Sequence, residues 1–468
     1  MRNLYKIKTL HFIFSFIIFS SSCKKFVEVD VPKTDLISST VFTSDATAHA
    51  AVAGIYNQMI AIGFASGDLT SLTYLTGLSS DELVFYSTSP SFQSTKEFYN
   101  NSLTPANPII STNIWSEPYK YIYKANAIIE GLARSTNITS ALKSELEGEA
   151  KFIRAFSHFY LVNLFGDIPL ITTTDYRVNA AAPRTPEAEV YNQIIADLKQ
   201  AQNLLSNDYS RFNGERVRPN KWAATALLSR VYLFNGDWVN AEIQATSLID
   251  NTALFNLQPI LNNVFLKNSK EAIWQLMPVY TIRNTWEAGT FKLTGTPTNS
   301  ALRNQLVNSF ETGDNRKINW IDSVRVGFNT FYYPYKYKVI SGTNPLQEYS
   351  MILRLAEQFL IRSEARAQQN NIGGAQADLN VIRNRAGLAI TSANDKVSLL
   401  TAVEHERQVE LFTEWGHRWI DLKRTGRAVA LLGPIKGTTW QTTDILYPIP
   451  QIQIQNDPSM ANAQNPGY

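Results

Sequence analysis

The chain has 468 residues, of which 44% are hydrophobic and 18% charged, a composition typical of folded proteins and not of disordered ones. Lys and Arg (43) nearly balance Asp and Glu (40), and three of the basic residues precede Cys23, which leaves 40 of each sign (43 − 3 = 40) in the rest of the chain. A neutral chain lacks the basic surface that nucleic acid binding requires, which excludes that class of function.

The N-terminus predicts export and lipid attachment. Residues 1–22 begin with basic residues and continue with the apolar run Leu10–Phe19, which is short for a membrane span and typical of a secretory signal peptide. Cys23, the only cysteine, follows three serines and resembles the cysteine of a bacterial lipobox, which is lipidated and becomes the first residue of the mature protein. Ser20 departs from that motif, which usually has Leu there.

The alternative at this end is an ordinary cleaved signal that leaves a free thiol at Cys23. A lipid anchor would instead hold the protein at a membrane surface, because no other segment is apolar for long enough to span a bilayer. The polar segment Lys24–Thr40, which contains Pro32, is interpreted as an extended tether that leads into the fold. Beyond it, helical periodicity predicts a scaffold over about 43–65, 109–260 and 350–430.

The stretch Asn220–Ile249 predicts a helical hairpin. Apolar or small residues recur four apart after Asn220, Asn235-Gly236 interrupts the helix, and Asp237 caps a second one. The residues that would let the two helices approach closely, and those that would fill the gap between them, are Ser229, Ala241 and Ala245, with Tyr232 and Trp238. These offsets are those of a tetratricopeptide repeat, and one such hairpin needs neighbours to bury its apolar face. The sequence therefore predicts a mostly α fold, a tetratricopeptide-like helical-hairpin scaffold.

Two loop-rich aromatic insertions interrupt this scaffold, at about 66–108 and 261–349. Both lack helical periodicity and combine aromatic with polar residues. In the second, Phe331, Tyr333, Tyr335 and Tyr337 alternate as on a strand with one covered face. Long loops in compact domains usually carry function, so these are the candidate ligand regions.

Catalytic and metal-binding motifs are not found. His405-Glu406 begins like the zinc motif HExxH, but Val409 occupies the position of the second histidine. Five scattered histidines and one cysteine predict no metal site, and without a phosphate-binding glycine loop no cofactor is expected.

Three glutamates are spaced four apart in one helical pattern: Glu406, Glu410 and Glu414, with Arg407, Arg418, Lys423 and Arg424 nearby. We interpret them as a structural ion-pair network. A glycoside hydrolase stays open as an alternative, because its two carboxylates need not be close in sequence.

The two insertions do supply sugar-binding chemistry, because a pyranose packs its C–H face on an aromatic ring and its hydroxyls bind polar side chains. The candidate ligand-binding residues are Trp286, Trp320, Phe85, Tyr86, Phe92, Asp81 and Arg283. Trp286 and Trp320 are the foremost, since both have polar neighbours and no strand or helix period. For each aromatic residue, packing in the core is the alternative.

Motifs over nearly the whole chain resemble one family. In order they include EAKFIRAFSHFY (149–160), LFGDIPL (164–170), RPNKWAA (218–224), LNVIRNRAG (379–387), RWIDLKRTG (418–426), YPIP (447–450) and QNPGY (464–468). The chain thereby resembles the SusD/RagB-type outer-membrane lipoproteins of Bacteroidetes. The motifs match scaffold positions, so no ligand residue carries over.

This resemblance implies a single SusD-like domain, an α–α superhelix over residues 23–468, anchored by lipid at Cys23 on the outer leaflet of the outer membrane. It implies a non-enzymatic protein that binds oligosaccharides and delivers them, as a lid, to a TonB-dependent SusC-like barrel. The alternatives are a peptide-binding lid of the RagB type, a purely structural tetratricopeptide scaffold and, least favoured, a glycoside hydrolase.

Overall fold

The computed structural model describes residues 41–468 except 281 and 344. The expected signal peptide, Cys23 and the tether up to Thr40 lie outside these residues, so they stay predictions. In the part of the chain that the structure describes, no helix is both long enough and apolar enough to cross a bilayer.

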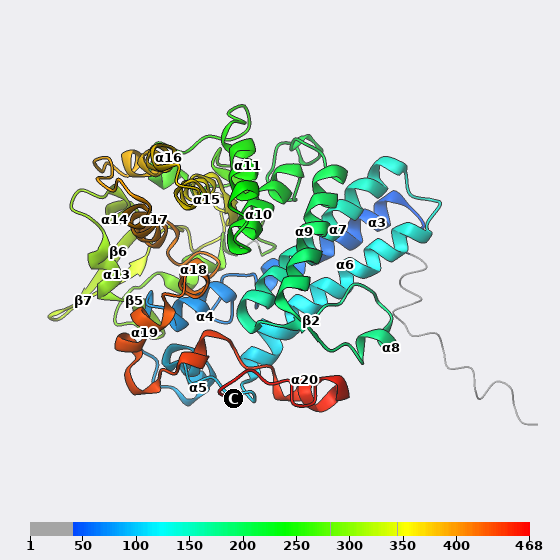
Figure 1. Ribbon diagram of the computed structural model, residues 1–468, viewed down its shortest axis with the longest axis horizontal. Coiled ribbons are helices and arrows are strands. Elements are labelled where there is room, and N and C mark those ends of the chain that lie inside the picture. Colours follow the sequence, from blue (N-terminus) through cyan, green and yellow to red (C-terminus); the bar gives the residue numbers. More distant parts are fainter. Residues whose placement is uncertain (1–40, 281, 344) are drawn as a thin grey trace, which may run out of the picture.

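Helices account for most of the fold (Figure 1). The longer ones are α3 (Asp45–Ala61), α6 (Glu117–Arg134), α7 (Ser140–Phe165), α9 (Glu187–Leu204), α10 (Lys221–Phe234), α11 (Trp238–Ile249), α15 (Leu355–Gln368), α16 (Ile372–Arg385) and α17 (Lys396–Leu411). The shorter ones are α4 (Leu72–Ser79), α5 (Gln93–Asn100), α8 (Tyr176–Asn179), α12 (Trp286–Phe291), α13 (Asn304–Ser309), α14 (Asn315–Trp320), α18 (His417–Arg424), α19 (Ala428–Lys436) and α20 (Gln451–Asn456).

Among the described residues, the strands form four two-stranded antiparallel sheets. They are β1 (Leu83–Phe85) with β5 (Ser300–Leu302), β2 (Ile168–Pro169) with β3 (Arg184–Thr185), β4 (Ala272–Leu276) with β8 (Ser350–Arg354), and β6 (Ile321–Val326) with β7 (Asn329–Pro334).

The long helices pack one after another into a curved array. In packing order it runs α3 and α6, α7, α9, α10, α11, α15, α16 and α17, with α6, α7 and α9 side by side at one end in Figure 1. Each neighbour covers a face that a single hairpin leaves apolar, which is how helical repeats obtain a continuous core. The expected tetratricopeptide-like, SusD-like superhelix is confirmed.

The hairpin of α10 and α11 shows how the sequence sets this packing. The side chain of Asn220 accepts hydrogen bonds from the backbone N–H groups of Trp222 and Ala223, and Asp237 caps α11 in the same way. The small residues predicted at the contact, Ser229, Ala241 and Ala245, are all fully buried. This hairpin and the burial of its small residues are therefore confirmed, although the Ser229 hydroxyl contacts Gln358 of α15.

Buried ion pairs tie successive helices together. They are Arg154–Asp197 between α7 and α9, Glu149 of α7 with Arg218 ahead of α10, and Arg230–Glu357 between α10 and α15. In the last pair both guanidinium contacts are 2.6 Å and both side chains are 1% exposed. Removing one partner of such a pair would leave an uncompensated charge in the core, so these pairs fix the helix register.

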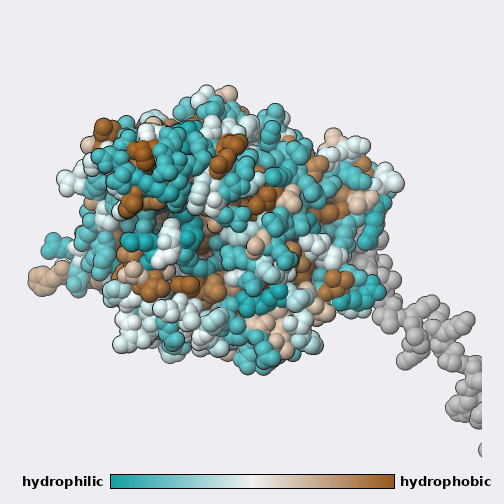
Figure 2. All heavy atoms as spheres, viewed as in Figure 1, coloured by the Kyte–Doolittle hydropathy of each residue, from teal (hydrophilic) through white to brown (hydrophobic). Residues whose placement is uncertain are grey.

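The two insertions are more ordered than the sequence indicated. The region 66–108 contains α4, β1 and α5, and 261–349 contains four of the short strands and three short helices. The expected alternation at Phe331 and Tyr333 lies on β7, but Tyr335 and Tyr337 follow its end. The β6–β7 hairpin projects from the body, and Phe328 at its tip is fully exposed (Figures 1 and 2).

Candidate functional site

The two insertions meet in space although they are about 200 residues apart in sequence. β1 pairs with β5, and the pairing continues at both ends, through Tyr86 N–H to Asn299 O (2.8 Å) and Arg303 N–H to Glu82 O (2.9 Å). Gly67 lies directly against the carboxyl group of Glu287. The candidate ligand regions therefore border one another.

Tyr280, Arg283 and Trp286 form a partly exposed group of two aromatic rings and a guanidinium that we call the Trp286 platform. The Arg283 guanidinium carbon lies 3.7 Å from the centre of the Trp286 ring, and Tyr280 approaches the same ring edge-on at 6.2 Å. Tyr280 is 42% exposed, and Trp286 is half-buried at the start of α12, where Thr285 supplies the N-cap. Stacking of a guanidinium on an indole holds the arginine in place. The Arg283 Nε and the Trp286 indole Nε1 are buried and have no hydrogen-bond partner among the described residues.

The base of the platform is held by a buried asparagine. Asn284 Nδ2 donates to Ser341 O (2.7 Å), and its Oδ1 accepts from the backbone N–H groups of Gln347 (2.7 Å) and Glu348 (3.0 Å). No carboxylate of the described residues pairs with Arg283. A cation beside the exposed Tyr280 ring, on a backbone held by Asn284, suits a ligand with hydroxyl or carbonyl oxygens.

Phe85, Tyr86 and Phe92 lie in a separate group at the β1 end of the first insertion. Tyr86, 39% exposed, meets Phe331 of β7 edge-on at 5.6 Å, and Phe85 contacts Tyr99 at 6.4 Å. Phe92 is half-buried at the end of a 3-10 turn before α5. The predicted aromatic residues are thus divided between two places.

Trp320 is fully buried, which corrects its proposed role as a stacking surface. Its indole Nε1 donates to Leu261 O at 3.1 Å, and its ring packs against Phe265 at 5.6 Å. The Lys336 ammonium lies 5.1 Å from the ring centre. Trp320 ends the short helix α14 and turns inward, so its polar sequence neighbours did not indicate exposure.

The predicted role of Asp81 as a ligand-binding residue is also corrected, because this side chain is buried and paired. Its two carboxylate oxygens accept two hydrogen bonds from Arg418, each 2.7 Å, and the residue is 7% exposed. A bidentate pair of this kind occupies both oxygens that a sugar hydroxyl would need. Asp81 therefore joins the first insertion to α18 in this structure.

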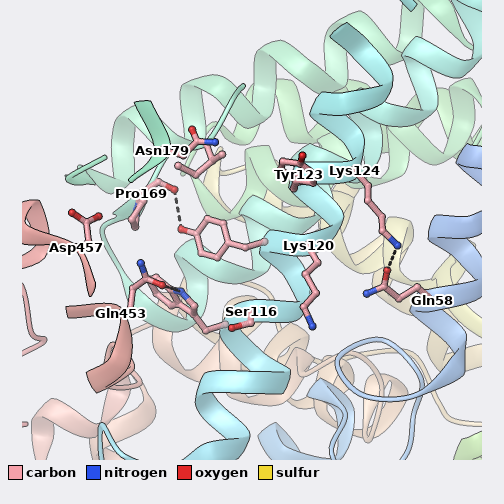
Figure 3. Close-up of a pocket in the computed structure, with 12 residues that line it drawn as sticks. Gln58, Ser116, Lys120, Tyr123, Lys124, Pro169, Asn179, Gln453 and Asp457 are labelled. Carbon is pink, nitrogen blue, oxygen red and sulfur yellow. Dashed lines mark hydrogen bonds between the residues drawn. The ribbon is translucent and has the colours of Figure 1, made fainter. Parts of the chain in front are cut away.

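A cleft that the sequence analysis missed lies along α6 (Figure 3). Trp115, Tyr119 and Tyr123 are spaced four apart and line a cavity of about 470 Å³ together with Gln453 and Asn179. The Tyr119 hydroxyl donates to Pro169 O (2.8 Å), and the Trp115 indole N–H donates to the Gln453 side chain (3.3 Å). The spacing of these aromatic residues in a helical pattern was a readable signal of an aromatic face.

The three glutamates of α17 and the following turn form a buried network. Arg316 contacts Glu406 (2.6 Å) and Glu410 (2.9 Å), and Arg354 contacts Glu410 (2.6 Å) and Glu414 (2.8 Å). The arginines Arg385, Arg354 and Arg316 offset the burial of Glu410 and hold its pKa well below the usual range. This geometry agrees with the interpretation as a structural network. The arginines that pair with Glu410 are Arg316, Arg354 and Arg385, which lie far away in sequence. They replace the four basic residues expected from the neighbouring sequence.

Helix α7 also carries a histidine without a polar partner. His158 is fully buried, neither ring nitrogen has a hydrogen-bond partner, and burial lowers its pKa to about 3. Within residues 41–280, 282–343 and 345–468, no group of three or more His, Cys, Asp or Glu side chains is arranged to hold a metal ion.

The fold and these sites together define a helical-repeat binding protein. Two family models match the chain: one described as "Starch-binding associating with outer membrane" over residues 34–233, and one described as "SusD family" over residues 280–468. The chain belongs to the SusD family, whose members are binding proteins and not enzymes.

Relatives and solved structures agree along the whole length. SusD-like proteins P25 and P2 of Formosa agariphila are 26% and 28% identical, over 97% and 92% of this chain and 98% and 94% of theirs. A laminarin-binding SusD-like protein has a TM-score of 0.75 at 23% identity, over 91% of this chain and 100% of its own. Surface glycan-binding protein A of Bacteroides uniformis also has a TM-score of 0.75, at 20% identity, over 90% and 99%. At these identities the two structures show the fold alone.

Proposed function

We propose that this chain is a cell-surface protein, anchored by lipid at Cys23, that binds oligosaccharides and delivers them as a lid to a TonB-dependent, SusC-like outer-membrane barrel. Two features support this: the matched family description names starch binding and outer-membrane association, and proteins of the same fold are named as laminarin-binding and surface glycan-binding proteins. The sequence adds the cysteine placement after an apolar leader.

The observation that supports the proposal best within the chain is the Trp286 platform. Its exposed Tyr280 ring offers a face for the C–H side of a pyranose, and Arg283 offers N–H donors to ring hydroxyls from a fixed position. Capture followed by closure over the barrel needs only reversible binding. We therefore place the glycan on this platform, with Tyr86 and Phe92 as a second contact for longer chains.

Calorimetry against a panel of starch, laminarin and other polysaccharide-derived oligosaccharides tests the binding. We expect one glycan class to bind, and Tyr280→Ala to weaken it about tenfold, which corresponds to about 1.4 kcal/mol. Phe328→Ala is the matched control, because Phe328 is an exposed aromatic residue away from the platform. Unchanged affinity in Tyr280→Ala would place the ligand elsewhere, and binding of peptides without glycans would favour the peptide-binding lid.

Partner and anchor have their own test. A mild-detergent pull-down of the tagged protein from its host should bring down a large outer-membrane barrel in about equal amount, and Cys23→Ala should release the protein from the membrane fraction. Recovery of the protein alone, or with periplasmic enzymes and no barrel, would contradict the lid. In that case hydrolysis of the bound glycan would be measured next, because recovery without a barrel favours the glycoside hydrolase alternative.

A further inference from the structure

A second hollow continues the cleft of Figure 3 along α6. Tyr123 and Lys124 line both, and the second has a volume of about 620 Å³. We call it the α3–α6 groove. Its lining includes small and apolar residues, Ala51 and Gly54 of α3 with Ala127, Ile128 and Gly131 of α6. Polar and charged residues, among them Lys124, Glu130, Arg134 and Thr174, line the rest.

The groove lies at the end of the helical array. α6 packs against α7 and α3, and the array continues from α7 to α9 and onward on the other side. Terminal repeats usually carry a polar outer face, because no further repeat covers them. An apolar groove in this position calls for a segment that covers it.

The chain enters the fold at the mouth of this groove. Val41, the first described residue, lines it. Phe42 is buried so close to Gly131 that a Cβ there would lie 2.1 Å from its ring, and Ser135 Oγ donates to Phe42 O at 2.7 Å. The residues just before Val41 are therefore held beside the groove at high effective concentration.

We propose that residues 33–40 of this chain lie in the α3–α6 groove, with Leu36 and Ile37 as the side chains that fill it. These two are the only apolar residues between Pro32 and Val41, and the others are Lys, Thr, Asp and Ser. Leu36 is five residues from Val41, about 16 Å of extended chain. The groove wall from Tyr123 to Arg134 covers eleven helical steps, about 17 Å, so the lengths match.

Charge favours the same placement. Asp35 is the only acidic residue in this stretch. The groove lining carries Lys124, Arg134 and one acidic residue, Glu130, which lies 3.5 Å from Arg134, so its charged side chains sum to one positive charge. Docking would shorten the free tether between the proposed anchor at Cys23 and the folded body from residues 24–40 to residues 24–32. It would thereby limit how far the body can move from the membrane.

Gly54 provides a clean way to block the groove. A Cβ at this position meets no atom within 4 Å, and its φ lies outside the left-handed region, so a larger side chain extends into the groove without disturbing the fold. Gly54→Trp fills the space, and Gly54→Ala is the matched control that changes helix propensity but leaves the groove open. Leu36→Asp with Ile37→Asp removes the apolar side chains and leaves every described residue unchanged.

Hydrogen exchange measures whether the segment is docked, because a docked backbone amide exchanges more slowly. The experiment uses the protein as its host processes it, purified in detergent. In the wild type and in Gly54→Ala we expect the backbone amides of residues 33–40 to exchange at least about tenfold more slowly than in an unstructured peptide. In Gly54→Trp and in the double aspartate variant we expect the unstructured rate.

Unstructured rates in the wild type would overturn the proposal, as would protection that Gly54→Trp and the double variant leave unchanged. Protection that rises with protein concentration, together with a dimer in light scattering, would assign the groove to a second copy of the chain and also overturn it. None of these readouts depends on glycan binding.

Discussion

A Cβ placed on Gly67 would lie 2.3 Å from the carboxyl carbon of Glu287, so a side chain at residue 67 would have to displace the Glu287 carboxyl group from its place against the first insertion. Gly67 also has φ +90°, a conformation that other residues rarely adopt. Glu287 is the second residue of α12, directly after Trp286, so this contact helps to set where the Trp286 platform lies relative to the first insertion.

Gly67→Ala should therefore destabilise the protein more than its backbone angle alone explains. We expect a loss of about 3 kcal/mol, of which about 1 kcal/mol is the positive φ and the remainder the overlap with Glu287. Gly214→Ala is the control, because Gly214 has φ +84° with no atom within 4 Å of its would-be Cβ. Gly214→Ala should lower the free energy of unfolding only by the part due to the positive φ, about 1 kcal/mol. Denaturant unfolding measures both, and equal losses would show that Glu287 moves aside freely.

Glu287 makes stability depend on pH near neutrality. Burial raises its pKa to about 7, with Glu348 and Asp68 adding repulsion, and its Oε2 has no hydrogen-bond partner. Because the pKa is higher in the folded state, the favourable contribution is complete below the unfolded value of about 4.5 and is lost as the pH rises through 7.

Glu287→Gln should remove this dependence, since the amide stays neutral. The stability of the variant relative to wild type should increase by up to about 3 kcal/mol between pH 4.5 and pH 8. Unfolding by denaturant at several pH values measures it, with Glu189→Gln, an exposed carboxylate, as the control. A constant difference across this range would mean that Glu287 is not protonated in the folded state.

Glu410 is expected to matter for stability and not for any reaction. It is fully buried and pairs with Arg316, Arg354 and Arg385, so Glu410→Ala leaves several cations short of a partner. A loss of about 3–5 kcal/mol follows from the cost of uncompensated buried charge. Glu404→Ala, at a partly exposed carboxylate, should cost about 1 kcal/mol or less. A small effect at Glu410 would contradict the structural network.

The helical scaffold could be predicted because its signals are local. Asn220 and Asp237 cap helices within three residues of themselves, and the small residues of the α10–α11 contact lie within one hairpin. A period of 3.6 in apolar residues reports directly which face is buried.

The site could be predicted only in part, because exposure depends on distant partners. Asp81 is occupied by Arg418, 337 residues further on, and Trp320 is covered by Phe265 and Lys336. The residues next to Asp81 and Trp320 in sequence give no indication of these contacts. Trp286 has equally polar neighbours and stays half-exposed, so composition alone could not separate the two tryptophans.

The two tryptophans should separate cleanly by experiment. Trp286→Ala should weaken binding of the glycan found by calorimetry about tenfold, because it removes the ring that holds Arg283 and supports Tyr280. Trp320→Phe should lower the free energy of unfolding by about 1–3 kcal/mol, because it leaves a cavity and an unpartnered Leu261 carbonyl, and should change affinity less than twofold. Calorimetry and denaturant unfolding on both variants make the comparison. The opposite pattern, lost affinity in Trp320→Phe and unchanged affinity in Trp286→Ala, would mean that the ligand binds where Trp320 becomes exposed, and the Trp286 platform would have to be abandoned.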